Sequence, residues 1–379
     1  MKEGVIVLGG HIQGLNIARI YGKAGIDVIV LDNDSKNLAK HSKFTKAFYL
    51  YQDSNFLPLL DHFKHHKLYK NWLIIPTNDA QVKLLSENKT YLERYFKVST
   101  HNWQVVQKCY NKIYTYTIAK ELNIPIAWTI FPQSKDELIS RDDIPYPCII
   151  KPAVMHTFYS KFKKKVFVCN NRKELLLNYE EASKVIPKDE IIIQDIIPGS
   201  SMNQYSVGAF FTNKEMINHI IVRRKRQHPI DFGNATTFAE SVEIEELKEL
   251  ANRFLEHIDY SGLCEVEFKF DSRDKSYKLL EINPRTWKWH SISEKAEVPF
   301  LLSLYYKTFH NRVIATKSFK KSCFRHLLLD SIMRLFYKEY RKQKTTCSKK
   351  ETQLAVWDKT DLAPAFWELI YFPYNILKR

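Results

Sequence analysis

Oxygen-bearing side chains with metal-binding potential cluster near residue 281. Glu281, Asn283 and Arg285 occupy alternate positions, and Glu267 lies upstream in a second apolar segment. Both segments read as strands joined by a polar turn, and side chains two apart on a strand share a face. Carboxylate and amide oxygens bind Mg²⁺, and an arginine beside them can neutralise charge on a transferred phosphoryl group. The alternative is a hairpin that carries ordinary surface acids.

Lysines that could meet phosphates come earlier in the chain. Lys151 ends a predicted buried strand at 148–152, where it can place a point charge on a phosphate. The loop that follows, 153–165, holds four more lysines and is either a cationic flap or a solvated hairpin tip. A further strand, 190–197, ends at a Pro-Gly turn, where backbone groups and Gln194 could contact a planar base.

A third group of cations forms the run 223–228. Arg223, Arg224 and Arg226 lie on a predicted strand, and guanidinium forks suit carboxylate and phosphate oxygens. The small polar residues at 233–237 are typical of a substrate loop. A nucleic-acid patch is the alternative, although apolar strand residues adjoin the run.

The first hundred residues predict a domain that would place further groups beside this chemistry. Apolar strands alternate with a glycine turn and a helix in the order of a βαβ unit. The turn is a weak dinucleotide fingerprint, because His11 replaces its second glycine. Asn78 and Asp79 follow a later strand, at the carboxyl edge where ligands of such sheets gather. The predicted elements are strands at 4–8, 27–32 and 73–76 and a helix at 15–23.

Beyond about residue 105 the pattern predicts an α+β domain with a mostly antiparallel sheet. Its strands are expected at 148–152, 190–197, 205–211, 219–223, 265–270 and 277–282, with helices at 113–122 and 245–257. We therefore predict a Rossmann-like α/β domain over 1–105 and an α+β domain over 106–310, whose flap subdomain covers about 125–195. A basic helical extension is expected over 311–379.

Composition limits the class of protein. The 379 residues are 45% hydrophobic and 26% charged, which is typical of a soluble globular chain. We expect a cytoplasmic protein, because the sequence lacks an apolar run of about 20 residues and a signal peptide, and its six scattered cysteines suit free thiols. The net charge is +16, and residues 311–350 hold 12 Lys/Arg against 2 Asp/Glu. That segment is either a solvated helix or a contact for nucleic acid or anionic lipid.

The order of these features is more specific than any one of them. Lys112, Lys151-Pro152, residues 194–197, Glu267 and residues 281–285 follow one another as in the ATP-grasp superfamily, which the chain resembles. The resemblance is strongest to stand-alone carboxylate–amine ligases, the group that contains D-aspartate ligase and carbamoyl-phosphate-synthase-like proteins. It extends over about the first 310 residues, with the Rossmann-like domain preceding the ATP-grasp domain.

The resemblance implies a role for each matching residue. Lys112 and Lys151 would contact the ATP phosphates, and Gln194, Asp195, Ile196 and Ile197 would hold adenine. Glu267, Glu281 and Asn283 would bind Mg²⁺, for which Mn²⁺ is an alternative. Arg285, Arg224 and Arg226 would be catalytic, while Arg223, Asn78, Asp79 and Trp287 would face the substrates.

The sequence departs from the family in its flap and after its adenine strand. Residues 26–198 contain no glycine, although this flap is glycine-rich in most such enzymes, and the ribose-binding acid is missing. We expect ATP- and Mg²⁺-dependent joining of a carboxylate to an amine through an acyl phosphate, on an amino acid, a peptide-like molecule or a cell-envelope precursor. The expected partners are those small molecules and not nucleic acid; membrane contact by 311–350 and a homodimer stay open. Other readings are a degenerate ATP-grasp scaffold and a basic nucleic-acid- or membrane-binding protein.

Overall fold

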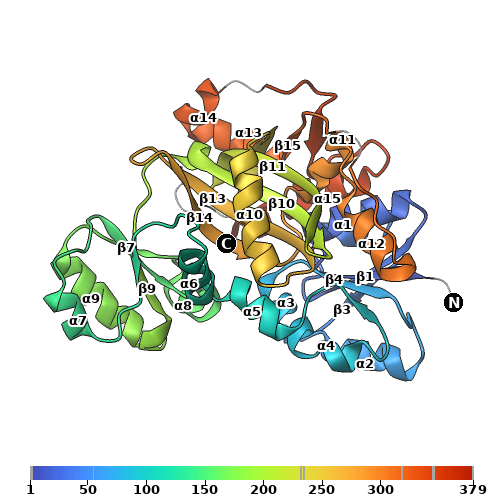
Figure 1. Ribbon diagram of the computed structural model, residues 1–379. Helices are drawn as coiled ribbons and strands as arrows, with labels where there is room; N and C mark the ends of the chain where they lie inside the picture. The colour runs from blue at the N-terminus through green and yellow to red at the C-terminus, as the bar shows by residue number, and fades with distance from the viewer. Residues whose placement is uncertain are drawn as a thin grey trace.

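Three sheets organise the chain in the computed structural model (Figure 1). The structure describes residues 3–53, 55–230, 233, 235–316, 319–343 and 346–377. The mixed α/β architecture confirms the predicted fold class. The glycine-rich opening forms a strand, a turn and a helix, as the sequence predicts.

The first sheet is a five-stranded parallel sheet with the order β3-β2-β1-β4-β5. Its central strands are mostly apolar and buried, as in a sheet covered by helices on both faces, although β2 begins and ends with aspartate. The strands are β1 (Gly4–Leu8), β2 (Asp27–Asp32), β3 (Ala47–Leu50), β4 (Leu73–Pro76) and β5 (Lys97–Val98). The helices are α1 (Ile12–Lys23), η1 (Leu38–His41), α2 (Leu57–His65), α3 (Asp79–Glu87) and α4 (Lys89–Leu92).

Two helices, α5 (Trp103–Tyr110) and α6 (Lys112–Glu121), lead from this sheet into a small four-stranded sheet with the order β6-β9-β7-β8. Its strands are antiparallel. They are β6 (Thr129–Ile130), β7 (Cys148–Pro152), β8 (Phe167–Cys169) and β9 (Ile191–Asp195). The helices of this unit are α7 (Lys135–Ser140), α8 (Met155–Phe162), α9 (Arg172–Ser183) and η2 (Lys188–Glu190).

A seven-stranded sheet forms the centre of the molecule, with the order β14-β13-β10-β11-β12-β15-β16. It is antiparallel apart from the pair β15–β16. Its strands are β10 (Gln204–Thr212), β11 (Glu215–His228), β12 (Ala235–Val242), β13 (Gly262–Asp271), β14 (Ser276–Asn283), β15 (Cys323–Arg325) and β16 (Thr352–Leu354). The helices around it are η3 (Ser201–Asn203), α10 (Glu245–His257), η4 (His290–Ile292), α11 (Ser293–Ala296), α12 (Phe300–His310), α13 (Leu327–Phe336), α14 (Lys338–Lys342) and α15 (Ala363–Leu377).

The C-terminal segment does more than extend the fold with helices. Strands β15 and β16 complete the edge of the central sheet, so the expectation of a purely helical extension is incomplete. The segment also packs against the first sheet, because Arg19 on α1 donates a buried hydrogen bond to Asp361 over 2.9 Å. Figure 1 shows α15 beside α1, whereas α13 and α14 lie farther away at the top of the view.

Two of the cysteines differ from the prediction. Cys323 and Cys347 form a disulfide that closes a segment of 24 residues, whereas Cys109, Cys148, Cys169 and Cys264 are free and buried. The prediction of free thiols is therefore wrong for this pair. The strand pairing β15–β16 brings the two segments together, which the spacing of the cysteines does not indicate.

Candidate active site

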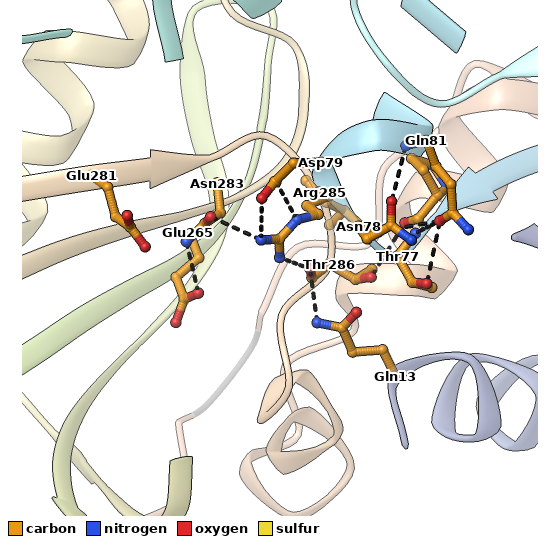
Figure 2. A network of polar contacts seen from close by, with 12 residues as sticks. Gln13, Thr77, Asn78, Asp79, Gln81, Glu265, Glu281, Asn283, Arg285 and Thr286 are labelled. Atoms are coloured by element: carbon orange, nitrogen blue, oxygen red, sulfur yellow. Dashed lines mark hydrogen bonds and ion pairs between the residues drawn. The ribbon is translucent and has the colours of Figure 1, made fainter. Parts of the chain in front are cut away.

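The register of β13 against β14 gathers four oxygen-bearing side chains. Glu267 lies directly opposite Glu281, and Glu265 lies directly opposite Asn283. Opposite residues share a face of the sheet, and so do residues two apart on one strand. Glu265, Glu281 and Asn283 lie together in Figure 2. Because like charges directly opposite each other are destabilising, this face requires nearby cations.

Two protein cations supply that charge. The Lys112 Nζ, at the start of α6, lies 3.3 Å from the Glu281 carboxylate, and the Arg224 Nη2, on β11, donates to Glu267 over 2.9 Å. Burial opposes ionisation of Glu281, yet the charges of Lys112 and Lys165 lower its pKa to about 2. Glu281 therefore stays ionised beside these lysines, as a ligand of a metal ion requires.

A cavity of about 180 Å³ lies on one side of this pair, between the central and the four-stranded sheets. Three lysines line it near the carboxylates, namely Lys112, Lys151 and Lys165. The rest of its lining includes an apolar group made of Ile149, Met155, Val166, Ile196, Ile197 and Leu280. Cations at one part and apolar side chains at another suit a molecule with a phosphate chain and a flat ring.

Lys151 lies deepest among these lysines. Its ammonium donates to the Tyr116 hydroxyl over 2.6 Å and to the Gln194 Oε1 over 2.7 Å. The Gln194 amide in turn donates to the Thr129 hydroxyl over 2.8 Å. Burial and the nearby Lys112 charge lower the pKa of Lys151 to about 7. This lysine would gain most from an anion, because an opposite charge favours its protonated form.

The end of β9 supplies the predicted adenine segment. Gln194 pairs with both β6 and β7, whereas Asp195 pairs with β7 and also accepts from Arg273 over 2.6 Å. The carbonyl of Ile197 accepts from Lys269 over 2.7 Å. Together with Ile196, these predicted residues line the smaller cavity.

A larger cavity of about 640 Å³ lies on the other side of the acidic pair, against the first sheet. It shares Arg224, Glu267 and Glu281 with the smaller cavity. Its remaining lining includes Glu265, Asn283, Arg285, Lys288 and Trp289 from the central domain, with His11, Gln13 and Thr77 from the first sheet. Two spaces thus meet at one arginine and two carboxylates, which is a geometry for transferring a group between two bound molecules.

Arg285, just after β14, connects the end of the acidic face to the first sheet. Its guanidinium donates to Asp79 over 2.6 Å and to the Asn283 Oδ1 over 3.0 Å, as Figure 2 shows. Asn78 caps α3 through a reciprocal capping box with Gln81. Within the described residues, the lining of the larger cavity includes Thr77 but neither Asn78 nor Asp79. Asn78 and Asp79, which the sequence predicts to face the substrates, therefore contact other protein groups in this structure: Asn78 caps α3, and Asp79 accepts from Arg285.

The three arginines of β11 do not act together, in contrast to the prediction. Arg226 is fully buried and forms a bidentate ion pair with Asp330 over 2.6 and 3.0 Å. Register shifts on both sides of Arg226 turn its side chain away from the face that Arg224 shares with Glu267. Arg223 donates to the Met202 carbonyl over 2.6 Å. Arg226, which the sequence predicts to be catalytic, therefore lies away from the described cavities, and only Arg224 of the three lines them.

Trp287 also lies elsewhere than predicted. Its side chain is 1% exposed and packs edge-on against Phe300 in the core beside the first sheet. A Cβ atom on Gly208 would approach the indole to 2.1 Å, so glycine at 208 makes room for it. Trp287, which the sequence predicts to face the substrates, therefore does not line either of the two described cavities at the acidic face. The neighbouring Trp289 lines the larger cavity and donates to Glu265 over 2.7 Å.

Sequence reasoning missed Glu265 and the position of Lys165. Glu265 is 4% exposed, and burial together with the Glu267 charge raises its pKa to about 8. Its spacing of two from Glu267 could have placed it on the same face. Lys165 belongs to the predicted flap, but burial lowers its pKa and it lies near Glu281 and Glu267. The flap itself differs from the expected loop, because residues 155–162 form helix α8.

The donors of the acidic face fit a magnesium ion. Glu267, Glu281 and Asn283 offer two carboxylates and one amide oxygen, the hard ligands that leave other positions of Mg²⁺ to substrate phosphates. No set of three or more His, Cys, Asp or Glu side chains that could hold a metal occurs in the parts of the chain the structure describes. The fit is therefore to an ion shared with phosphates and not to an ion enclosed by protein.

Known proteins resemble the chain in sequence and in fold. Residues 111–302 match the carbamoyl-phosphate synthase L chain, ATP-binding domain family. A D-aspartate ligase of Enterococcus faecium is 26% identical over 227 residues, which are 57% of this chain and 53% of that protein. The chain thus spans about half the length of this relative.

Solved structures share the fold. The N5-carboxyaminoimidazole synthetase of Staphylococcus aureus has a TM-score of 0.65 at 18% identity and covers 93% of this chain and 92% of its own. The L-amino acid ligase of Bacillus licheniformis has a TM-score of 0.62 at 11% identity, over 85% and 79% of the two chains. The biotin carboxylase domain of the Hydrogenobacter thermophilus 2-oxoglutarate carboxylase, a dimer with MgADP, has a TM-score of 0.67 at 15% identity, over 85% and 73%.

The matched family region covers just over half of the chain and contains Lys112, Lys151, the adenine segment and all of the acidic face. The predicted resemblance is therefore confirmed, and the chain belongs to the carbamoyl-phosphate synthase L chain, ATP-binding domain family of the ATP-grasp superfamily.

Proposed function

We propose that the protein is an ATP- and Mg²⁺-dependent ligase that joins a carboxylate to an amine through an acyl phosphate. The observation that supports this function best is the meeting of two cavities at Arg224, Glu267 and Glu281. One cavity has the lysines and apolar wall that suit a nucleotide, and the other has room and polar groups for the substrates.

In this proposal the nucleotide lies along β9, with its phosphates among Lys112, Lys151 and Lys165. Glu267, Glu281 and Asn283 would hold Mg²⁺, or Mn²⁺ in its place. A bound metal ion would neutralise charge on the transferred phosphoryl group. Lys112 would then exchange its ion pair with Glu281 for contact with phosphate.

The first step forms a bond between a carboxylate oxygen and the γ-phosphorus and breaks the bond to ADP. Arg224 would orient the reacting groups, since its Nη2 contacts Glu267 while its buried Nε has no hydrogen-bond partner within the described residues. In the second step the amine nitrogen attacks the acyl carbon, phosphate leaves with the carbon–oxygen electron pair, and the nitrogen loses a proton to solvent. Arg285 reaches the same cavity and would stabilise the negative charge of the intermediate.

An amino acid is favoured as one substrate, because two of the similar proteins are a D-aspartate ligase and an L-amino acid ligase. A peptide-like or cell-envelope precursor would be the other. We further propose a cytoplasmic protein with three parts, over 1–105, 106–310 and 311–379, in which the flap subdomain covers about 125–195. A homodimer and contact of 311–350 with anionic membrane belong to the same proposal, and nucleic acid does not. None of the described helices is long and apolar enough to cross a membrane.

The test is ATP turnover by the purified full chain with a panel of amino acids and carboxylates. Glu281→Gln should lower turnover at least about 100-fold, the scale of losing one electrostatic group of an active site. Glu249→Gln on the exposed side of α10 is the matched control and should turn over ATP like the wild type. The ligase proposal fails if the wild type neither binds Mg-ATP nor hydrolyses it with any pair.

A nucleotide-binding scaffold without turnover is the second candidate. It is favoured by the volume of the smaller cavity, about 180 Å³, which lies below the roughly 300 Å³ of ordinary ligand pockets. Met155 from α8 contributes to that lining. Nucleotide binding that is indifferent to Glu267→Gln and Glu281→Gln, without turnover, would select this candidate.

A further inference from the structure

Helix α15 presents an apolar face to solvent. Leu362, just before the helix, is 58% exposed, and Phe366, Leu369 and Ile370 are 61%, 49% and 48% exposed. Their spacing of three and four residues places them on one side of the helix. The only charged residue from 363 to 377 is Glu368, which is buried and 2.6 Å from His326. The exposed face therefore carries no charge.

The opposite side of α15 is firmly packed, so the apolar face has a fixed position. Trp367 stacks on His41 of η1 with ring centroids 4.2 Å apart, and the Tyr371 hydroxyl lies 3.0 Å from the His41 Nε2. Ala365 is 1% exposed in the core cluster that contains the first sheet. The exposed apolar groups are thus displayed by an anchored helix.

Lysines border this face. Lys36 lies 3.8 Å above the Tyr374 ring of α15, and Lys36 is exposed. Lys40 and Lys43 are exposed on and after η1, which packs against α15, and the Lys43 amide donates to Asp361 over 3.0 Å. Of the acids nearby, Asp361 is buried with Arg19, Asp358 pairs with Lys23, and Asp34 is partly exposed near Tyr371, so the three exposed lysines still leave an excess of positive charge.

We propose that the α15 face docks on an anionic lipid surface, with Phe366, Leu369 and Ile370 in the headgroup region and the lysines of 36–43 on lipid phosphates. A helix with an uncharged apolar side and lysines at its border has the properties of an interfacial helix. Each lysine near such a surface strengthens binding through the negative surface potential. A second copy of the chain is a less suitable partner for the α15 face, because two such faces in contact would bring their positively charged lysines together.

The test is co-sedimentation of the full chain with vesicles of phosphatidylcholine alone or with about one third phosphatidylglycerol. We expect binding to the anionic vesicles only, and weakening from about 0.1 M to about 1 M NaCl as the Debye length shortens. The double variant Phe366→Ser/Leu369→Ser should lower the partition coefficient at least about tenfold. Lys40→Gln/Lys43→Gln should lower it by several-fold for the same lipid.

Matched controls distinguish binding through this face from nonspecific hydrophobic binding and from misfolding of the variants. Leu177→Ser/Ile139→Ser removes two apolar side chains that are 54% and 47% exposed in the four-stranded unit, and it should bind like the wild type. Thermal unfolding should remain cooperative in every variant, since the altered side chains are exposed. The proposal is overturned if the wild type ignores anionic vesicles, if Phe366→Ser/Leu369→Ser binds unchanged, or if light scattering shows a dimer that this variant dissociates without any lipid binding.

Discussion

Lys151 offers a test of the nucleotide cavity that needs no substrate. The residue is 7% exposed, its ammonium donates to the Tyr116 hydroxyl and to Gln194, and its pKa falls from 10.5 to about 7 through burial and the Lys112 charge. Because the folded pKa is the lower one, the unfolded chain binds more protons between these values. Stability from this group is therefore lost as the pH falls from about 10.5 to about 7.

The size of the effect follows from the same two values. Near pH 7 the folded protein binds about half a proton at Lys151 and the unfolded chain binds almost one. Integration from about pH 7 to about pH 9 gives a rise of about 2 kcal/mol in the free energy of unfolding of the wild type. Lys151→Met removes this pH dependence of stability. The variant also leaves the buried Gln194 Oε1 without its lysine donor, which costs about 1–3 kcal/mol at every pH.

Chemical denaturation of wild type and Lys151→Met at both pH values measures the effect. The stability of the variant relative to the wild type should be about 2 kcal/mol lower at pH 9 than at pH 7. Lys161→Met, which alters an exposed lysine of α8, should show no such change. A stability difference that is the same at the two pH values would refute the assignment of Lys151 as a buried, destabilised cation. Nucleotide affinity should fall in Lys151→Met alone.

Three further results are expected. Arg226→Met should lower the free energy of unfolding by about 3–5 kcal/mol, because it leaves Asp330 buried beside one remaining arginine, and denaturation curves would measure this. Gly208→Ala should cost about 1–3 kcal/mol and lower the melting temperature, since its Cβ would meet the Trp287 indole at 2.1 Å; an unchanged melting temperature would contradict the core position of Trp287. Cys323→Ser should cost about 3 kcal/mol more under oxidising conditions than in a reductant, from the loop of 24 residues it opens, because the cost of burying a hydroxyl at this site is common to both.

The elements of the site could be predicted because they depend on local pattern. The strands that carry Lys151 and Glu281 and the helix at 245–257 lie where the hydrophobic periodicity predicts them. Alternation along one strand also sufficed to place Glu281 and Asn283 on one face.

Features that depend on irregular pairing or on distant partners could not be predicted. Strict alternation would put Arg224 and Arg226 on one face, but the register shifts beside Arg226 separate them. Trp287 is buried because Gly208, far away in the sequence, leaves space for it. Helix α8 takes the place of a glycine-rich flap, and the absence of glycine from this stretch favours a helix. That the helix packs through its buried Phe158 could be seen only in the structure.

The return of the chain to its starting point has a mechanical consequence. Arg19 with Asp361, Asn16 with the Ala355 carbonyl, and Lys23 with Asp358 tie the last residues to α1. Because residues 355–361 directly follow β16 at the edge of the central sheet, these contacts join the first and central sheets into one frame. The four-stranded sheet is connected to this frame by two segments of the chain, 122–128 and 196–203. We therefore expect an opening of the smaller cavity to move that sheet relative to the frame, because the acidic face on β13 and β14 belongs to the frame.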